Sequence, residues 1–235
     1  RTIELCRNIY LQFNNKLYIE FASGISVKTL NEEVISWMVK AGMKQINIAI
    51  ESGNQYVQDE VINKKLKLER VKPIVEILKK YDVIVRAFFI MGFPDETIEM
   101  IMDTKNFAKD LKLDWSVFSF ASPIAGSKLY ETAMANKQIL IEDNDATTFL
   151  QFRLKSNNWK YEDIKKIQEE ANIEINFLEN YNLVEGNYGK SILIFKNILK
   201  DYPTHLFGNY CLWKSYVGLH DYTQAKEIEE KIRKI

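Results

Sequence analysis

The chain contains 235 residues, of which 46% are hydrophobic and 12% aromatic. This composition is ample for a buried core and argues against a disordered chain. The length suggests one large domain or two small ones. Thirty-two lysines and arginines balance thirty-two aspartates and glutamates, so no net charge draws the protein to nucleic acid or to an anionic membrane.

The two cysteines, Cys6 and Cys211, are too few and too far apart for a disulfide framework or for a cysteine-ligated metal cluster within this chain. They fit a reducing environment, and we expect a cytoplasmic protein. No apolar run approaches 18 residues and no secretory signal is present, so a membrane span is not predicted. Because the chain opens on Arg1 in the middle of a helical pattern, we expect a fragment of a longer protein.

Four short and mostly apolar segments predict strands that are covered on both faces, as in a parallel sheet. They lie at 17–21, 46–50, 83–91 and 115–120. Helical patterns precede and separate them, at 2–13, 31–41, 54–62, 68–80 and 96–111. Asn31 is placed to cap the 31–41 helix and Gly42 to end it, whereas Pro73 is expected to weaken the 68–80 helix.

Strands that alternate with helices of this length indicate consecutive βα units with right-handed crossovers, and therefore an α/β fold. A curved sheet, as a whole or partial barrel of about four parallel strands, is our first interpretation, and a flat doubly wound sheet is the second. Neither GxGxxG nor GxxxxGK[ST] occurs at a strand-to-helix turn, which weakens the nucleotide-binding versions of the flat sheet.

Polar or backbone-exposing residues follow the predicted strands. In parallel sheets ligands bind at the carboxyl ends of the strands, so these residues predict a binding rim. The rim consists of Glu20 with Ser23-Gly24, then Glu51-Ser52-Gly53, then Gly92 to Glu96, and finally Pro123 to Gly126. The carboxylates suit hydroxyls or an ammonium group, and open backbone at Gly92 and near Ala121 suits the edge of a heterocycle. The competing interpretation is a set of ordinary Ser-Gly turns.

The composition changes after the fourth strand. We expect a barrel portion over 1–130, a linker or excursion over 131–165, and a helical region over 166–235. In the last region Asn187-Tyr188 recurs as Asp221-Tyr222, Ser191 as Ala225, Leu178 as Leu212, and Ile198 as Ile232, always 34 residues apart. This period predicts a tetratricopeptide-like tail of antiparallel helix pairs, with the apolar members in the seam and Gly186 and Gly218 in helix-end turns. Two generic helix hairpins are the alternative.

Four motifs of the chain stand in the same order as in one enzyme family. They are Ser23-Gly24-Ile25, Glu51-Ser52-Gly53, the run FIMGFPDET over 89–97, and the run SPIAGS over 122–127. Together they resemble radical S-adenosylmethionine (SAM) enzymes, in particular the class that carries an amino-terminal cobalamin-binding domain. The resemblance covers about residues 1–175 and implies the later strands of a partial (β/α)6 barrel.

The resemblance also implies cofactors and the residues that bind them. Glu51 and Ser52 would contact the ribose and amino-acid parts of SAM, while Ile90 to Gly92 and Phe120 to Ala121 would lie along adenine. Glu20, Ser23 and Gly53 belong to the same predicted site. A 4Fe–4S cluster and cobalamin are implied as further cofactors, with ligands and domain outside this chain.

The sequence departs from the family pattern at several positions. The CxxxCxxC loop that binds the cluster and the Gly-Gly-Glu segment of the second barrel strand are absent. Asp95, Asn54 and Ser23 stand where the family has Gly, Ser and Asn. No catalytic residue or metal ligand is therefore assigned within the chain, and His205 and His220 are expected in packing or surface roles.

Two functions of different classes remain open. The first is a radical SAM enzyme, with cobalamin-dependent methyl transfer or rearrangement as its chemistry and an unidentified small molecule or peptide as its substrate. The second is a non-catalytic interaction protein that binds a protein partner through its tail and keeps a vestigial barrel. Three upstream cysteines would favour the first. A conventional phosphate-binding (β/α) barrel is disfavoured because no Gly-rich loop precedes a short helix near the last strand.

Overall fold

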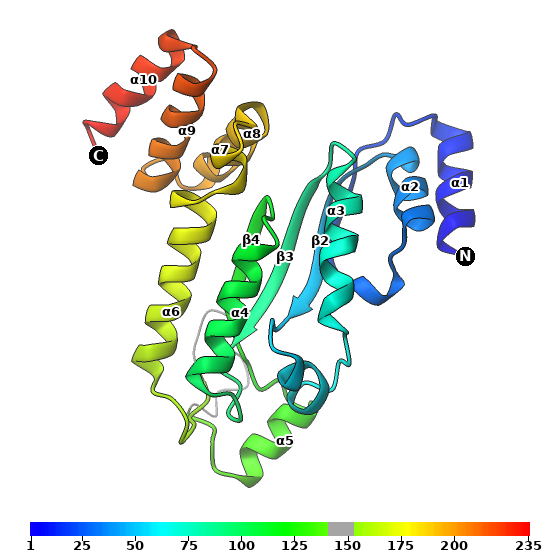
Figure 1. Cartoon of the computed structure of the whole chain (residues 1–235), viewed down its shortest axis with the longest axis vertical. Coiled ribbons are helices and arrows are strands. Elements are labelled where there is room, and N and C mark those ends of the chain that lie inside the picture. The colour runs from blue at the N-terminus through cyan, green and yellow to red at the C-terminus, as the bar shows by residue number, and fades with distance from the viewer. Residues whose placement is uncertain (141–152) are drawn as a thin grey trace. The chain divides into compact units, whose positions relative to one another are not determined.

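The computed structural model describes residues 1–140 and 153–235. The chain divides into two compact units, Arg1–Glu169 and Glu170–Ile235. The first unit holds the strands and most of the helices around them, and the second is helical (Figure 1). The middle of the predicted 131–165 linker lies outside the described residues.

Four parallel strands form the sheet of the first unit in the order β1-β2-β3-β4. Their bounds are Ile19–Ser26 (β1), Met43–Glu51 (β2), Ile84–Met91 (β3) and Trp115–Phe120 (β4). Each strand pairs with the next strand in the sequence, and helices connect them. This arrangement confirms the predicted α/β fold with about four parallel strands.

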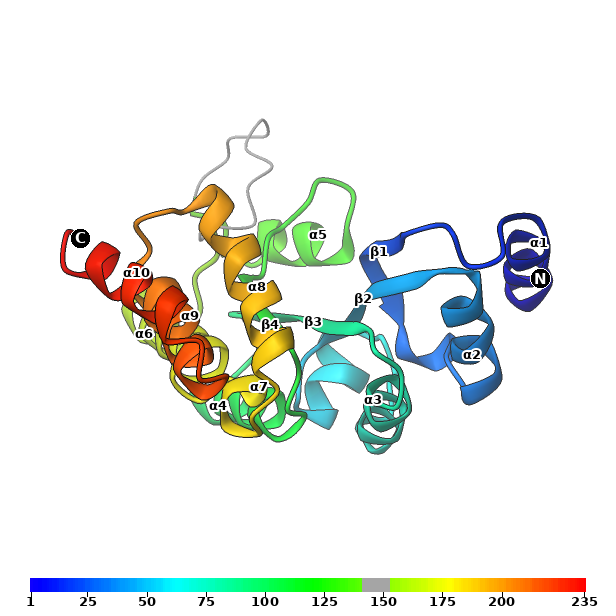
Figure 2. The same cartoon turned by 90° about the horizontal axis from the view of Figure 1, so that it is seen from above.

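Helices cover one face of the sheet. They include α2 (Glu32–Ala41), α3 (Val71–Lys79) and α4 (Ile98–Asp110), whereas α1 (Thr2–Phe13) packs on α2. In Figure 2, α3 and α4 lie on the same side of β3. Alternate residues of β3 are fully buried toward this side, while Arg86, Phe88 and Ile90 point to the other face and are half-buried. The second face carries the side chains that matter for the site.

The helix ends follow the sequence signals closely. Asn31 Oδ1 accepts a hydrogen bond from the Val34 N–H at 2.9 Å, and Gly42 ends α2 with a left-handed φ of 116°. Pro73 differs from the expectation. It occupies the third residue of α3, where the missing N–H has no partner within the helix, so it does not weaken this helix.

The first strand is longer than predicted and is displaced along the chain. β1 runs through Ser23 and Gly24 to Ser26, and its register with β2 breaks between Phe21 and Ile25. A Cβ at Gly24 would stand 2.7 Å from the Cβ of Ala49. The glycine therefore lets the irregular part of β1 lie against β2, and Ser23-Gly24 is not a strand end as predicted.

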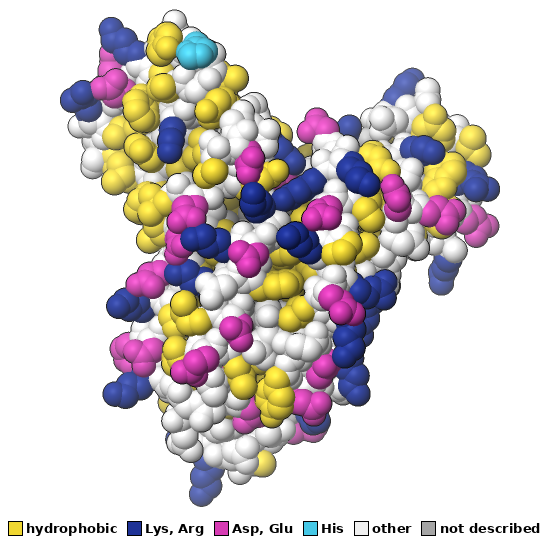
Figure 3. Space-filling model, viewed as in Figure 1, with side chains coloured by type: hydrophobic (Ala, Val, Ile, Leu, Met, Phe, Trp, Pro, Cys, Tyr) yellow, Lys and Arg dark blue, Asp and Glu magenta, His cyan; other side chains and the backbone are white. Residues whose placement is uncertain are grey.

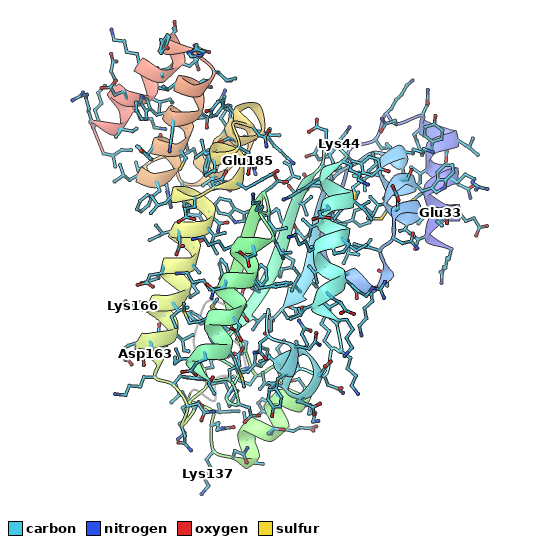
Figure 4. The ribbon with its side chains drawn as sticks, in the orientation of Figure 1. Glu33, Lys44, Lys137, Asp163, Lys166 and Glu185 are labelled. Atoms are coloured by element: carbon cyan, nitrogen blue, oxygen red, sulfur yellow. The ribbon has the colours of Figure 1, made fainter. Side chains whose placement is uncertain are left out.

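The remaining elements of the first unit follow β4. They are α5 (Lys128–Ala135), an isolated antiparallel bridge between Ile139 and Leu154, and α6 (Tyr161–Ile173), which continues into the second unit. Gln168 of α6 donates to the Phe118 carbonyl of the edge strand at 2.9 Å. Asp163 and Lys166 project from the opposite side of α6 (Figure 4). Positive and negative side chains both occur across the surface seen in Figure 3.

The second unit is built from helices only. Its elements are η4 (Glu174–Leu178), α7 (Tyr181–Val184), α8 (Tyr188–Asp201), α9 (Leu206–Gly218) and α10 (Tyr222–Ile232). Tyr188 and Tyr222 each begin a helix, and the Ser191 hydroxyl lies 2.7 Å from that of Ser215 in the packed interior. The tetratricopeptide-like superposition of two 34-residue repeats stays a prediction.

One expectation for this unit is wrong. Leu178 is 53% exposed instead of lining a seam, whereas its predicted counterpart Leu212 is buried. Gly218 is the last residue of α9, at the predicted helix end. A Cβ there would lie 2.3 Å from the Tyr188 ring, so this glycine also leaves room for an aromatic side chain. Gly186, with a φ of 76°, does make the predicted turn between α7 and α8.

Close packing of α4 on the end of β2 makes Gly53 sensitive to substitution. An alanine Cβ there would lie 2.4 Å from the Phe107 Cβ and 2.9 Å from the Asp103 carbonyl oxygen, both fixed by the helix. We expect Gly53→Ala to lower the free energy of unfolding by about 2 kcal/mol or more. Gly189→Ala, with no atom within 4 Å of the new Cβ, is the control and should change stability by no more than about 1 kcal/mol. Equal unfolding midpoints in urea for both variants would contradict this account.

Candidate functional site

The carboxyl ends of four strands meet at one edge of the sheet, because all strands are parallel. The strands end at Ser26, Glu51, Met91 and Phe120. Of the predicted site residues, Glu51, Ile90, Gly92, Phe120 and Ala121 lie at or next to this edge. Whether these five residues bind a ligand stays a prediction, and we call this region the carboxyl edge.

Glu51 is the ionisable side chain that ends a strand at the carboxyl edge. Its φ of 74° is left-handed, and the register of β2 with β3 breaks between Ala49 and Glu51. Glu51 Oε1 accepts a hydrogen bond from Lys64 Nζ at 2.8 Å, and the same ammonium donates to the Ala49 carbonyl at 2.9 Å. Within residues 1–140 and 153–235, the second oxygen Oε2 has no hydrogen-bond partner. One carboxylate oxygen of Glu51 is therefore bonded within the protein, and the other is available to a ligand.

Ser52 does not face the carboxyl edge, contrary to the prediction. Its side chain is fully buried, and its hydroxyl lies 3.1 Å from the Thr104 hydroxyl of α4 while accepting from the Asn54 N–H. The Gly53 N–H also donates to Thr104 Oγ1, at 3.0 Å. The three residues of the Glu-Ser-Gly motif therefore have different roles. The Glu51 carboxylate lies at the carboxyl edge, whereas Ser52 and Gly53 pack against α4. Gly53 was expected to allow a ligand to approach the backbone closely, but the group that approaches it is helix α4.

Gln58 is a residue of this region that the sequence interpretation missed. It is fully buried, and its amide nitrogen donates to the carbonyls of Ile50 and Ser52, both at 2.7 Å. It thereby satisfies the last acceptors of β2 from within η2 (Val57–Val61), a π-helical turn. A glutamine seven residues after a strand carries no recognisable sequence signal.

The loop after β3 is held by a buried carboxyl group. Gly92 has a left-handed φ of 87°, and Glu96 Oε2 accepts from the N–H groups of Gly92 and Phe93, both at 2.8 Å. Burial raises the pKa of Glu96 to about 7, against the two backbone hydrogen bonds, which lower it. Its other oxygen is buried and has no hydrogen-bond partner among the described residues. Glu96 shapes this loop from inside and does not present its carboxyl group to a ligand.

A segment of the predicted linker packs on the same loop. Trp159 is buried and donates its indole N–H to the Phe93 carbonyl at 3.1 Å. The Ser156 hydroxyl and the Asn158 amide both donate to the Pro94 carbonyl. Side chains from 156–159 and from Glu96 therefore fix the conformation of the 92–95 loop from two directions.

The backbone donors that were expected to bind a heterocycle are already used. The Gly92 N–H bonds to Glu96, and the Ala121 N–H donates to the Met91 carbonyl at 2.9 Å. Open backbone was predicted at Gly92 and around Ala121, and these two N–H groups are not free to bind a ligand. Ile90 pairs with Ser119 in the adjacent strand, and both side chains are half-buried on the face opposite the helices.

Glu20 and Ser23 lie elsewhere. Glu20 is the second residue of β1 and pairs with Gln45, in the amino half of the sheet. Burial lowers the pKa of Arg86, and the Glu20 charge opposes this effect, so the two charges interact on the same face. Glu20 was expected at a strand end because the strand was placed too early in the sequence. Ser23 is exposed within the irregular part of β1.

Other reactive side chains are structural. His205 Nδ1 accepts from the Gly208 N–H at 3.1 Å as the cap of α9, and its ring stacks on Phe177. Cys6 and Cys211 are free and buried, and burial raises the pKa of Cys211 to about 12. No group of three His, Cys, Asp or Glu side chains in the described parts of the chain is arranged to hold a metal ion. In the same parts, no helix is long and apolar enough to cross a membrane.

The raised pKa of Glu96 predicts a pH-dependent stability. The folded state keeps its proton up to about pH 7, whereas the unfolded chain loses it near 4.5. The free energy of unfolding should therefore fall as pH rises through this interval, by up to about 3 kcal/mol. Glu96→Gln cannot titrate and should lack this fall in urea unfolding experiments. Glu76→Gln, at an exposed position of α3, should behave as wild type. Parallel pH profiles for all three proteins would contradict the assignment.

Comparison with known proteins places the chain in context. The model of the Radical SAM superfamily matches residues 3–108. An uncharacterized methyltransferase of Pyrococcus horikoshii is 32% identical over 157 residues, which cover 67% of this chain and 34% of that protein. Cytidylyl-2-hydroxyethylphosphonate methyltransferase of Streptomyces wedmorensis is 28% identical over 163 residues, which cover 65% of this chain and 30% of that protein. The chain thus spans about a third of the length of these relatives.

Solved structures support the fold. The cobalamin-dependent S-adenosylmethionine radical enzyme OxsB superposes with a TM-score of 0.54 at 12% identity, over 100% of this chain and 45% of its own. Coproporphyrinogen III oxidase (HemN) of Escherichia coli, a radical SAM enzyme, superposes with a TM-score of 0.52 at 13% identity, over 74% of this chain and 36% of its own. Together with the motifs and the parallel sheet, the family model and the sequence relatives show that residues 3–108 of this chain belong to the Radical SAM superfamily.

Proposed function

We propose that this chain is part of a larger radical SAM enzyme and that its carboxyl edge binds SAM. The observation that carries the proposal is the position of Glu51. It ends a central strand of a radical SAM sheet, and one of its carboxylate oxygens is free of partners in the described part of the chain. Ligands of such sheets bind at this edge.

The side chains at the carboxyl edge fit SAM in part. Ribose hydroxyls and an ammonium group are donors, and Glu51 Oε2 is an acceptor with a full charge. Ile90 offers a half-buried aliphatic surface suited to one face of an adenine ring. Ser52 does not fit, because its hydroxyl is buried against Thr104. Phe120 and Ala121 would contribute by packing and not through the Ala121 N–H.

The iron–sulfur cluster does not fit this chain. The sequence has two cysteines, and no metal-binding group of three ligands exists in the described residues. Its ligands would have to come from residues beyond these 235. In the whole enzyme such a cluster would supply the electron for reductive chemistry on SAM. The residues of this chain would bind and orient SAM.

We extend the proposal to methyl transfer onto a small organic acceptor, since two relatives are named methyltransferases. Cobalamin would be a second cofactor, carried on a domain outside this chain. We also propose a cytoplasmic location and a protein partner for the helical unit. The domain bounds remain proposals as well, at 1–130, 131–165 and 166–235. The two free, buried cysteines are compatible with a reducing compartment.

The role of Glu51 is testable in the full-length protein. We expect Glu51→Gln to weaken SAM binding by about tenfold to a hundredfold, because a charge-assisted hydrogen bond is replaced by a neutral one. Isothermal titration calorimetry measures the affinity directly. Glu60→Gln changes an exposed carboxylate of the following turn and serves as the control. If both variants bind SAM as wild type does, Glu51 is not a cofactor ligand and the proposed site is wrong.

A further inference from the structure

The loop at 62–67 returns to the carboxyl edge in an unusual conformation. It connects η2 with η3 (Leu68–Arg70), the short turn before α3. Asn63 and Lys65 both have a left-handed φ of 51°, and the residue between them is Lys64. Non-glycine residues in this region of backbone space cost energy, so the surrounding structure must impose the conformation. Glu51, the partner of Lys64, is left-handed as well.

Several contacts impose this conformation. The Lys65 N–H donates to the Gln58 carbonyl at 2.9 Å, and Leu66 is buried below the loop. The Gln55 amide donates to the Leu66 carbonyl at 3.1 Å. Lys28, which follows β1, donates its ammonium group to the Lys64 carbonyl. The loop is thus tied to the turn after β1 through Lys28 and to the segment after β2 through Gln55 and Gln58.

These contacts hold the ammonium group of Lys64 in one position. Lys64 Nζ bonds to Glu51 Oε1 at 2.8 Å and to the Ala49 carbonyl at 2.9 Å. The side chains of Lys64 and Glu51 are 23% and 21% exposed, so the pair is partly shielded from water. Ion pairs in such surroundings are held more firmly than those on an open surface. The bond to the Ala49 carbonyl anchors the ammonium group to the strand itself.

We propose that Lys64 is a positioning residue for the SAM site. It occupies Glu51 Oε1 and thereby aims the remaining oxygen, Oε2, at the cofactor. This inference rests on the proposed function, because it gives Glu51 the role of ligand and Lys64 the role of its support. The strained backbone on both sides of Lys64 is accounted for by this task, since a relaxed loop would not return the side chain to the end of β2.

The experiment measures SAM affinity by calorimetry in the full-length protein, with thermal unfolding of each variant alongside. Lys64→Met should weaken binding about tenfold. Lys64→Arg, which keeps the charge and donors, should recover most of the affinity. Lys65→Met is the matched control, because this neighbouring lysine is exposed, and it should bind as wild type does. If Lys64→Met does not fold, Lys64→Gln replaces it, since an amide retains a donor without the charge.

A double variant separates positioning from direct contact. If Lys64 acts through Glu51, Glu51→Gln combined with Lys64→Met should bind SAM no more weakly than Glu51→Gln alone. Additive losses would mean that Lys64 touches the ligand independently, and they would overturn the inference. A Lys64→Met variant of lowered melting temperature and unchanged affinity would overturn it too, leaving Glu51 as ligand. Unchanged affinity in Glu51→Gln would instead reject the proposed SAM site itself.

Discussion

The close approach of α4 to the end of β2 is the constraint on which the carboxyl edge depends. Only a glycine at 53 leaves room for Phe107 and for the backbone of α4. Thr104 uses this proximity to bond to both the Ser52 hydroxyl and the Gly53 N–H. Ser52 is thereby drawn toward the helix, and the chain must turn at Glu51, which takes a left-handed conformation and breaks the β2–β3 register. The same packing that stabilises the unit leaves the carboxylate at the edge.

The polar groups near the edge are for the most part bonded within the protein. Gln58 accounts for two carbonyls at the end of β2, Glu96 for two N–H groups after β3, and Trp159 for one carbonyl of the same loop. A ligand at this edge would therefore meet a backbone that is already rigid. Such preorganisation favours binding, because less conformational entropy is lost when the ligand is bound.

On the face of the sheet opposite the helices, polar and charged side chains in the amino half give way to mostly apolar side chains toward the carboxyl edge. Arg86 and Asn47 are paired neighbours in its amino half, and both carry a buried nitrogen or oxygen without a partner in the described residues. Toward the carboxyl edge the paired side chains are Ala49 with Phe88 and Ile90 with Ser119. Charge thus lies in one half of this face and a largely apolar surface in the other, with Glu51 at the outer end of the apolar half. An apolar surface that ends in a carboxylate suits a ligand with a flat ring and donor groups.

The sequence by itself determined the fold class, because apolar strands, capped helices and glycine stops are local signals. Asn31, Gly42 and the strands at 83–91 and 115–120 were all predicted close to their observed places. It also placed Glu51 at a strand end. Only the tertiary structure decided which way each side chain of Glu51-Ser52-Gly53 turns, since that depends on Thr104 and Phe107, about fifty residues away. The supporting roles of Gln58, Lys64 and Trp159 were likewise hidden, because hydrogen bonds to backbone atoms leave no periodicity or motif in the sequence. Glu20 was misplaced for the same physical reason, since the break in β1 arises where Gly24 packs on β2 and not from any local signal.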